Sequence, residues 1–495
     1  MKKSSNYRLI FGYLGIFLIF IGCTCLFPLI LLAFYPEESG DWLKFFVPGI
    51  STVAIGVGLM QLLRGLKGAK LGKHQDSVVL IMVWLLAIGI CAIPFILRDD
   101  MNFSQAMFET TSGFATIGLT IFQDFDSHIY VFYRAICNLV GGVGLVLIIT
   151  TAISDRYGLK LYIAEGHSDK PLPNLKKSAL VILGIYLGII FVGTISYMFA
   201  GVSLFDALVH SICAVSTGGF SSKANGLLGL NVEGVNFPAV EIISIVLMIL
   251  GATNFLTHFL IITGKGKKAI KDCEIKLFAG FAIAFVPIFF ISAAVRGDLG
   301  WSYDSFRTSA FTYVSAITTT GFSNISDLRL LGEGVMILVV FVNIIGGGMG
   351  STSGGVKLYR VAVAGKSFYW GTRERFGHSR MVYPHFINRC GEEKEITTND
   401  SFEAFGYIIL YITVLFLGGF LVTLFSDFPY NDSLFEFSNA LAGTGLTNGL
   451  SAACSNNAPV LWIMIVGMFA GRLEILVIYF AFYRIIRDIF RKDTI

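Results

Sequence analysis

The sequence predicts an all-α polytopic membrane protein with about ten transmembrane helices. Three observations lead to this fold class: the composition, the number of long apolar segments and an internal repeat. Of the 495 residues, 55% are hydrophobic and 14% are charged, whereas soluble proteins carry about 25% charged residues. This composition argues against a soluble enzyme, a nucleic-acid-binding protein and a disordered scaffold. The net charge of +4 is too small to indicate an acidic partner.

Ten segments are apolar enough to cross the hydrocarbon core, which takes about 20 residues of helix. They are 9–35, 43–63, 77–97, 128–153, 178–200, 238–263, 274–296, 333–363, 404–425 and 458–485. The termini and alternate loops hold 29 of the 37 Lys and Arg residues. Because cytoplasmic segments are enriched in these residues, we expect both termini in the cytoplasm. The longest cytoplasmic loop would be 366–402, either an anchor at the membrane surface or a docking site for a soluble partner.

Four shorter segments lie between these spans on the opposite side of the membrane: 103–118, 205–219, 306–321 and 433–445. Each ends in a glycine, and these glycines are 101, 102 and 124 residues apart. Such self-similarity indicates one repeated unit, which reads as helix, short helix, Thr- and Gly-containing turn, helix. The loop residues are Thr116, Ile117 and Gly118; Thr217, Gly218 and Gly219; Thr319, Thr320 and Gly321; Gly443, Thr444 and Gly445.

This plan is that of a re-entrant pore loop, since irregular backbone at membrane depth persists only where protein buries it or where it lines a water-filled cavity. Four helix–pore-loop–helix repeats around one central pore would present a ring of backbone carbonyls, which can replace the hydration shell of potassium. Glycine suits this ring because it adopts positive φ without strain. The alternative is four ordinary glycine-rich packing turns. We favour a potassium filter formed by the twelve loop residues, which would be the only metal site.

Three further motifs accompany the repeat: Asn138–Gly144 (NLVGGVG), Gly346–Lys357 (GGGMGSTSGGVK) and Gly471–Ile475 (GRLEI). Together with the four loops, they resemble the Trk/Ktr/HKT superfamily of potassium transporters. The resemblance covers about 77–485. Two extra N-terminal spans, 9–35 and 43–63, make the chain look like the longer, bacterial Trk-type membrane subunit.

The resemblance implies potassium uptake across the bacterial inner membrane by a homodimer with one pore per subunit. It also implies gating by a cytosolic nucleotide-binding regulatory subunit of NAD/ATP type, with no nucleotide on this chain and K+ as the transported ion. Membrane lipid is the remaining partner, and no nucleic acid is expected. All four selectivity positions of the family are glycine here, which implies preference for potassium over sodium. The fourth loop departs from the pattern, because Gly443 replaces the leading threonine.

A candidate gate lies in the eighth predicted span, where six of the ten residues 346–355 are glycine. Each glycine costs a helix about 1 kcal/mol relative to alanine, so this span should break. The alternative is a GxxxG packing face. We favour an intramembrane gating loop below the filter, made of Gly346, Gly347, Gly348, Gly350, Ser351, Thr352, Ser353, Gly354 and Gly355.

Arg472 is expected near the middle of the last span, where facing lipid would cost at least about 2.5 kcal/mol. It should therefore face protein or water and act as a positive charge that raises the barrier to cations below the filter. Glu474 is two residues away, on a different helical face, and is a poor partner for it. Lys357 and Arg360 are expected to extend to the cytoplasmic interface.

Other ionisable residues within the repeats admit structural or functional interpretations. Glu109 and Glu436 occupy equivalent positions, where the other repeats have His210 and Thr312. We expect hydrogen bonds to filter backbone, with an ion-attracting vestibule as the alternative. A proton relay through His258 and Glu241 is not favoured.

The predicted units are 1–70 (N-terminal helix pair), 71–165, 166–268 and 269–365 (pore repeats 1 to 3, the third with the gating loop), 366–402 (cytoplasmic loop) and 403–495 (pore repeat 4). The predicted mechanism is electrodiffusion through a gated pore, driven by the membrane potential. The alternative is a proton- or sodium-coupled potassium symporter. An enzyme is not expected, since the sequence has neither a metal-ligand cluster nor a Walker motif.

Overall fold

The computed structural model describes residues 2–63, 75–98, 100–144, 174–376, 385–479 and 483. The α-helices are α1 (Lys2–Leu26), α2 (Trp42–Met60), α3 (Gln75–Ile96), α4 (Phe103–Phe114), α5 (His128–Val143), α8 (Leu175–Phe199), α9 (Leu204–Val215), α10 (Phe237–Gly251), α11 (Phe255–Ile262), α12 (Gly266–Ile270), α13 (Cys273–Arg296), α14 (Tyr303–Ile317), α15 (Glu333–Ile345), α16 (Leu358–Phe376), α17 (Thr398–Phe425), α18 (Tyr430–Ala442), α19 (Leu450–Ala453) and α20 (Ala458–Arg472). Short 3-10 helices are η1 (Phe27–Ala33), η2 (Pro36–Asp41), η3 (Gln61–Leu63), η4 (Gly226–Leu230) and η5 (Leu328–Leu331).

Among the described residues, six helical segments are long and apolar enough to cross a membrane. They coincide with six of the ten predicted spans: 9–35, 43–63, 77–97, 178–200, 274–296 and 404–425. The other four predicted spans contain shorter helices. The multi-pass membrane character predicted from composition is therefore confirmed.

The predicted span 238–263 is not one straight helix, because α10 and α11 meet at an angle of 103°. The side chain of Asn254 causes the break by accepting the Leu256 amide at the start of α11. The span 333–363 is interrupted between α15 and α16, as its glycines predict. In the span 128–153, α5 ends at Val143, and residues 145–153 lie outside the described residues.

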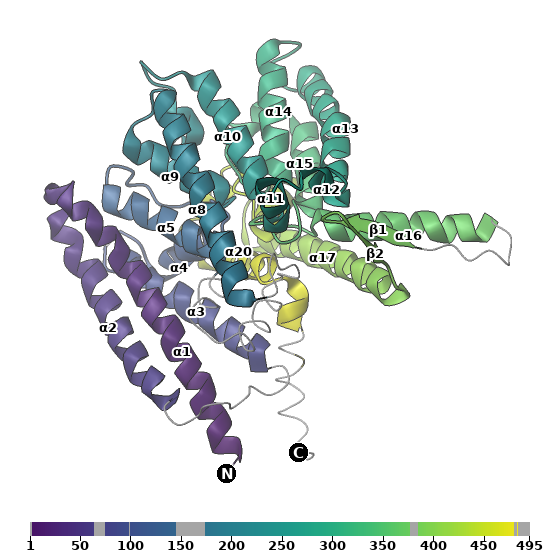
Figure 1. Cartoon of the computed structure of the whole chain (residues 1–495). Coiled ribbons are helices and arrows are strands. Elements are labelled where there is room, and N and C mark those ends of the chain that lie inside the picture. Colours follow the sequence, from purple (N-terminus) through teal and green to yellow (C-terminus); the bar gives the residue numbers. More distant parts are fainter. Residues whose placement is uncertain are drawn as a thin grey trace.

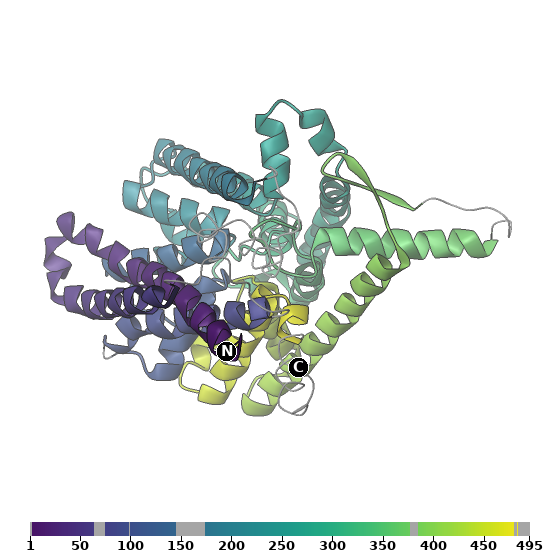
Figure 2. The same cartoon turned by 60° about the horizontal axis from the view of Figure 1, so that its bottom comes forward.

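Each of the short helices α4, α9, α14 and α18 packs against the long helix before it: α3, α8, α13 and α17, respectively. The helix that follows each short helix packs against the short helix of the next repeat, so that α5 contacts α9, α10 contacts α14 and α15 contacts α18. The last repeat contacts the first through α20 and α4. The four units therefore form a closed cycle, seen from two directions in Figures 1 and 2.

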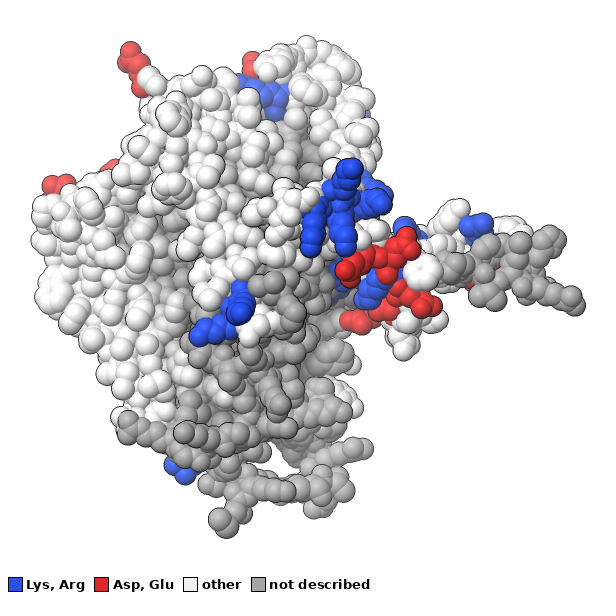
Figure 3. Space-filling view, viewed as in Figure 1, with Lys and Arg blue, Asp and Glu red and all other residues white. Residues whose placement is uncertain are grey.

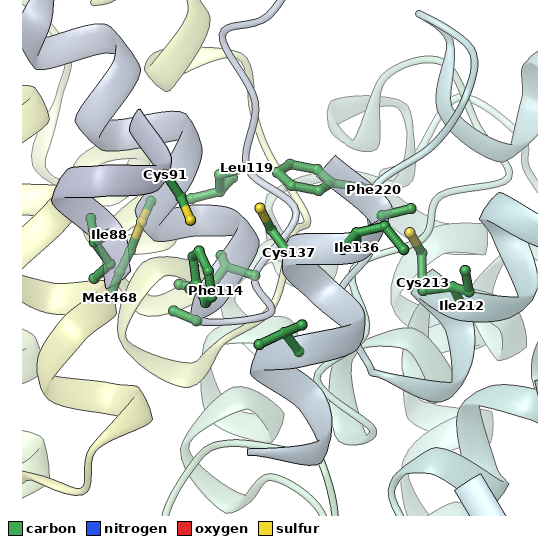
Figure 4. Close-up of a cluster of buried hydrophobic side chains, with 14 of the residues drawn as sticks. Ile88, Cys91, Phe114, Leu119, Ile136, Cys137, Ile212, Cys213, Phe220 and Met468 are labelled. Carbon is green, nitrogen blue, oxygen red and sulfur yellow. The ribbon is translucent and has the colours of Figure 1, made fainter. Parts of the chain in front are cut away.

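The core of this cycle is apolar, and the N-terminal helices lie outside it. α1 packs against α2 and α3 at the edge of the first repeat (Figure 1). Figure 4 shows the buried cluster where α3, α4, α5, α9 and α20 meet. Its labelled residues are Ile88, Cys91, Phe114, Leu119, Ile136, Cys137, Ile212, Cys213, Phe220 and Met468.

The segment after the third repeat projects from the helical body. α16 extends outward, and the chain returns through α17 (Figure 2). Between them, β1 (Phe386–Arg389) and β2 (Glu392–Glu395) form an antiparallel hairpin, in which Phe386 pairs with Glu395. The all-α class is corrected in this detail: the predicted loop 366–402 holds the end of α16, the two strands and the start of α17. Charged side chains gather at this end of the visible face, while most of that face is uncharged (Figure 3).

Candidate functional site: four loops and the segment beneath them

The four short helices end in the same way. The second loop residue donates its amide to the carbonyl five residues earlier, as in a Schellman cap. These bonds are Ile117 N to Ser112 O (2.9 Å), Gly218 N to Cys213 O (2.8 Å), Thr320 N to Ser315 O (2.9 Å) and Thr444 N to Asn439 O (2.9 Å). The repeat inferred from the sequence is thus a repeat of backbone geometry.

The residue that leads each loop has positive φ: 53° at Thr116, 50° at Thr217, 54° at Thr319 and 81° at Gly443. Threonine is β-branched and strained in this region, and such strain persists only where surrounding structure enforces it. Gly443 adopts the same conformation without strain. The departure of the fourth loop from the sequence pattern therefore leaves the backbone path unchanged.

The glycines of successive loops touch one another. A Cβ at Gly118 would lie 2.6 Å from the carbonyl oxygen of Gly218. A Cβ at Gly219 would meet Thr320 O, and one at Gly321 would meet Gly445. A Cβ on Gly445 would in turn meet Ile117 O, which returns to the first loop. The loops therefore close a ring in chain order, with no space for side chains at these positions.

Two cavities lie on either side of this ring. One, of about 230 Å³, is lined by Gly118, Gly219, Gly321 and Gly445 together with the residues that follow them. The other, of about 30 Å³, is lined by Thr116 and Gly443 from the ring and by residues of the predicted gate. These gate residues are Ser351, Ser353, Gly354 and Arg472. The ring thus separates a wide space from a narrow one.

The segment 346–357 is a loop packed against the narrow side of the ring. Gly346, Gly350 and Gly355 all have positive φ, so they do not form a helical GxxxG face. The Gly354 amide donates to Thr319 Oγ1 over 2.8 Å, and Thr352 Oγ1 donates to Gly251 O over 2.9 Å. The structure therefore brings the predicted gate residues together below the second and third loops.

The N-terminal part of this loop is bonded to α13 and to the residues that follow α10. The Met349 amide donates to Glu274 Oε1 over 2.7 Å, and the Gly348 amide donates to Ala252 O over 3.0 Å. Ser351 Oγ and Ser353 Oγ lie 2.7 Å apart within the loop. Polar groups of the loop are thus paired inside the protein, as backbone at membrane depth requires.

Arg472 is the last residue of α20, and helical residues resume at 475 after a break at Leu473 and Glu474. The backbone leaves the helical conformation after it, since Glu474 has a φ of 60°, and Gly471 leaves no room for a side chain beside Leu441 O. The guanidinium of Arg472 donates to Thr352 O over 2.8 Å and also to Gly141 O near the end of α5. Arg472 therefore joins the loop 346–357 to the first repeat and lines the narrow cavity.

Glu474, Arg360 and Lys357 form an ion-pair cluster, which corrects the expectation that Lys357 and Arg360 extend to the cytoplasmic interface. Arg360 Nη2 lies 2.7 Å from Glu474 Oε2, and Lys357 Nζ lies 3.6 Å from Glu474 Oε1. Arg360 and Glu474 are each 8% exposed, so Arg360 does not extend to the interface. Glu474 pairs not with Arg472 but with residues more than 110 positions away, which helical spacing cannot reveal.

Carboxylates of the short helices bind the segments that follow the ring. Glu109 accepts the Ile121 amide (3.0 Å), and Glu436 accepts the Asn448 amide (3.1 Å). His210 Nε2 lies 2.9 Å from Ser221 Oγ, at the equivalent place in the second repeat. Both glutamates bond to backbone, but at residues three positions beyond Gly118 and Gly445 and not to the filter backbone, as was expected.

His258 and Glu241 have separate partners. His258 Nε2 lies 2.8 Å from Leu250 O, whereas Glu241 accepts a hydrogen bond from Asn324 (2.7 Å) and pairs with Arg307. These contacts give no support to a proton relay between them.

The comparisons with known proteins agree on one family. A family model described as "TrkH: Cation transport protein" matches residues 44–488. The chain belongs to this family. Its relatives include the uncharacterized cation transporter MJ1485 of Methanocaldococcus jannaschii, 28% identical over 92% of this chain and 91% of the relative. The Trk system potassium uptake protein TrkH of Salmonella typhimurium is 27% identical over 95% and 97%.

The fold has a solved counterpart in the potassium transporter TrkH from Vibrio parahaemolyticus. The TM-score is 0.81 at 22% identity, over 96% of this chain and 98% of that one. Membership in a cation transport family confirms the predicted family resemblance and makes this chain a transporter, not an enzyme.

Three buried polar residues of the site were missed by sequence reasoning. Arg134 pairs with Glu109 (2.7 Å), and its charge inside a predicted span was the available signal. Asn138 abuts Gly218, and Asn343 accepts a hydrogen bond from Thr444 Oγ1 (3.1 Å). Both asparagines begin an N-x-x-G-G sequence, a second repeat that would have identified them.

Proposed function

We propose that this chain mediates potassium uptake across the bacterial inner membrane through a gated, channel-like pore. Relatives that align over nearly the whole chain are named potassium uptake proteins. The observation that carries the proposal is the closed cycle of loop contacts between a wide and a narrow cavity. In this cycle, the carbonyls of the twelve loop residues, 116–118, 217–219, 319–321 and 443–445, are the potassium ligands, and glycine at all four selectivity positions favours potassium over sodium.

The proposed gate is the loop 346–355 together with Arg472. The loop lies directly under the ring, and Arg472 carries a positive charge into the narrow cavity. A cation leaving the filter would meet this charge and a space of about 30 Å³. Withdrawal of the loop and its arginine would remove both barriers at once.

The assembly is proposed to be a homodimer in which each subunit has its own pore and binds a cytosolic, nucleotide-binding regulatory subunit of NAD/ATP type. The outward extension of α16 supports a second copy, since its Phe368, Tyr369 and Phe376 are 73%, 60% and 89% exposed. Relatives are named as proteins of a Trk system, which supports a regulatory partner. Nucleotide is expected on that partner, not on this chain.

We propose the orientation with both termini in the cytoplasm, as the distribution of Lys and Arg favours. The wide cavity then faces the periplasm. The proposed units are the N-terminal pair 1–70, the pore repeats 71–165, 166–268, 269–365 and 403–495, and the cytoplasmic segment 366–402. The cyclic helix contacts support this division.

The test is ion flux into proteoliposomes that contain the purified chain at a fixed membrane potential. Potassium and rubidium should enter in preference to sodium, and Gly118→Ser should reduce the potassium/sodium discrimination. Gly280→Ser on α13 is the matched control, because a Cβ there meets nothing within 4 Å. Unchanged discrimination in the Gly118→Ser variant would contradict the filter. Uptake that collapses when a proton or sodium gradient is removed at constant voltage would instead support the symporter.

A further inference from the structure

An apolar groove opens on the outer surface of the second repeat, away from the ring. Its volume is about 770 Å³, and its walls are α8, α10 and α11. The lining is aliphatic except for Ser196 and His258. Several wall residues, among them Val192, Ile242 and Ile262, are more than 60% exposed. An apolar concavity on the lipid-facing side of a membrane protein is suited to hydrocarbon and not to a polar solute.

Two glycines form the floor of the groove. Gly184 and Gly188 lie one turn apart on α8 and resemble a GxxxG packing motif. Neither packs against a helix, because a Cβ at either position would meet nothing within 4 Å. Gly193, further along α8, does contact α10 through Leu247. The missing side chains at 184 and 188 therefore create open space between helices that touch elsewhere.

The groove has the length of a lipid chain. Its lining on α8 extends from Val181 to Ser196, which is about 22 Å at 1.5 Å per residue. One leaflet of the hydrocarbon core is about 15 Å deep. An acyl chain can therefore lie in the groove over the full depth of its leaflet.

A cluster of lysines follows the α11 wall of the groove in the chain. The lining ends at Ile261 and Ile262, and the chain then turns directly into α12. Exposed lysines occupy this short helix and its flanks, and Figure 3 shows the resulting basic patch beside the acidic hairpin. They are Lys265, Lys267, Lys268 and Lys271. In the part of the chain that the structure describes, no carboxylate lies within 4.0 Å of their ammonium groups.

The position of α12 is fixed by the neighbouring hairpin. Asp272, directly after α12, accepts the Cys390 amide over 2.8 Å, and Gly391 packs against the stem of Lys268. The lysines are therefore carried on an anchored element that follows α11, one wall of the groove. Positive charge at a membrane surface attracts anionic headgroups.

We propose that this groove and the lysines of α12 form a binding site for an anionic phospholipid. One acyl chain occupies the groove between α8, α10 and α11, and the phosphate-bearing headgroup binds Lys265 and Lys267. The two parts of the ligand are recognised separately: the acyl chain by the open space at Gly184 and Gly188, and the negative charge by the lysines. The site does not depend on the identity of the transported ion.

The experiment measures lipid retention by the full chain in detergent, using native mass spectrometry with phosphatidylglycerol or phosphatidylcholine of identical acyl chains. The wild-type protein should retain phosphatidylglycerol at least tenfold more than phosphatidylcholine. The variant Gly188→Leu, which fills the groove, should lose retention of both lipids. The matched control is Gly280→Leu on α13, where a side chain also meets nothing within 4 Å, and its retention should equal that of the wild type.

A second pair of variants tests the headgroup. The double variant Lys265→Gln/Lys267→Gln should lower the preference for phosphatidylglycerol roughly tenfold while retention of phosphatidylcholine stays unchanged. The double variant Arg373→Gln/Arg375→Gln removes the same charge from α16 and should behave as the wild type. Equal retention in Gly188→Leu and the wild type would overturn the groove assignment. A change of oligomeric state in Gly188→Leu with lipid retention intact would also overturn it, since the occupant would then be a second copy of the chain.

Discussion

The ring loops and the segment 346–357 are both irregular, glycine-rich backbone at membrane depth, but they are held in different ways. Each ring loop is bonded to its own helix, as in the contact of Gly218 N with Cys213 O, and touches the next loop through backbone. The segment 346–357 is attached to distant elements, in part through the side chains of Thr319, Thr352, Arg472 and Glu274. The ring is therefore held by backbone contacts within and between its loops, whereas the segment below it is held in part by side chains of other elements.

The largest effect on potassium flux is expected from a substitution within the ring of loops. Gly321→Ala should reduce potassium flux by at least about 100-fold, because φ is 89° and the new Cβ meets the backbone of Gly445. Rubidium flux in proteoliposomes measures the loss. Gly280→Ala is the control, and flux near wild-type level in Gly321→Ala would show that the loops do not line the pathway.

The second-largest effect is expected from the ion-pair cluster of Glu474, Arg360 and Lys357, which holds the end of the segment 346–357. Glu474→Gln leaves Arg360 and Lys357 without their carboxylate partner, which should lower the free energy of unfolding by about 3 kcal/mol. Thermal unfolding in detergent measures this change. Glu333→Gln, at an exposed position on α15, should have no effect. If the two variants have equal melting temperatures, the ion-pair cluster does not stabilise the fold.

Removing Arg472, which joins the segment 346–357 to the first repeat, should open the pathway. Arg472→Gln deletes the charge in the narrow cavity and its bond to Thr352 O. Hydrogen bonds to charged groups contribute about 1.5–3 kcal/mol, so flux through the chain without a regulatory partner should rise about tenfold. Arg472→Lys keeps the charge and should stay close to the wild type. A fall in flux in Arg472→Gln with unchanged folding would argue against a gating role.

The smallest effect is expected from a single hydroxyl. Thr352→Val keeps the shape of the side chain but removes a hydroxyl whose one proton is donated to Gly251 O or Val215 O and which also contacts Thr217 Oγ1. The loss of one neutral bond is worth about 1 kcal/mol, which corresponds to a rise in flux of about fivefold. Thr253→Val is the control, because the Thr253 hydroxyl donates to Ile249 O at the end of α10. If both variants behave alike, Thr352 does not contribute to holding the segment in place.

Local sequence signals predicted the ring well. The four loops, their order and the break after Ile345 all follow from residues adjacent in the chain, because a helix cap or a run of glycines acts over one or two turns. The sequence correctly excluded Arg472 as the partner of Glu474, but it did not predict that Arg360 and Lys357 pair with this carboxylate. The pairing of Arg360 with Glu474 joins segments 114 positions apart, and no spacing rule reports such a contact.

The bend between α10 and α11 was missed for a related reason. An apolar run of the right length predicts a span, but the direction of its helices depends on the cap at Asn254 and on the packing of Gly348 against Ala252.

The sequence by itself determined that this protein crosses the membrane repeatedly and carries four similar loops, because hydropathy, charge distribution and glycine placement act locally. The tertiary structure decided how those loops meet, what lies beneath them and which buried charges pair. These contacts bring together residues from different repeats, and their energies depend on distances that exist only once the helices have packed.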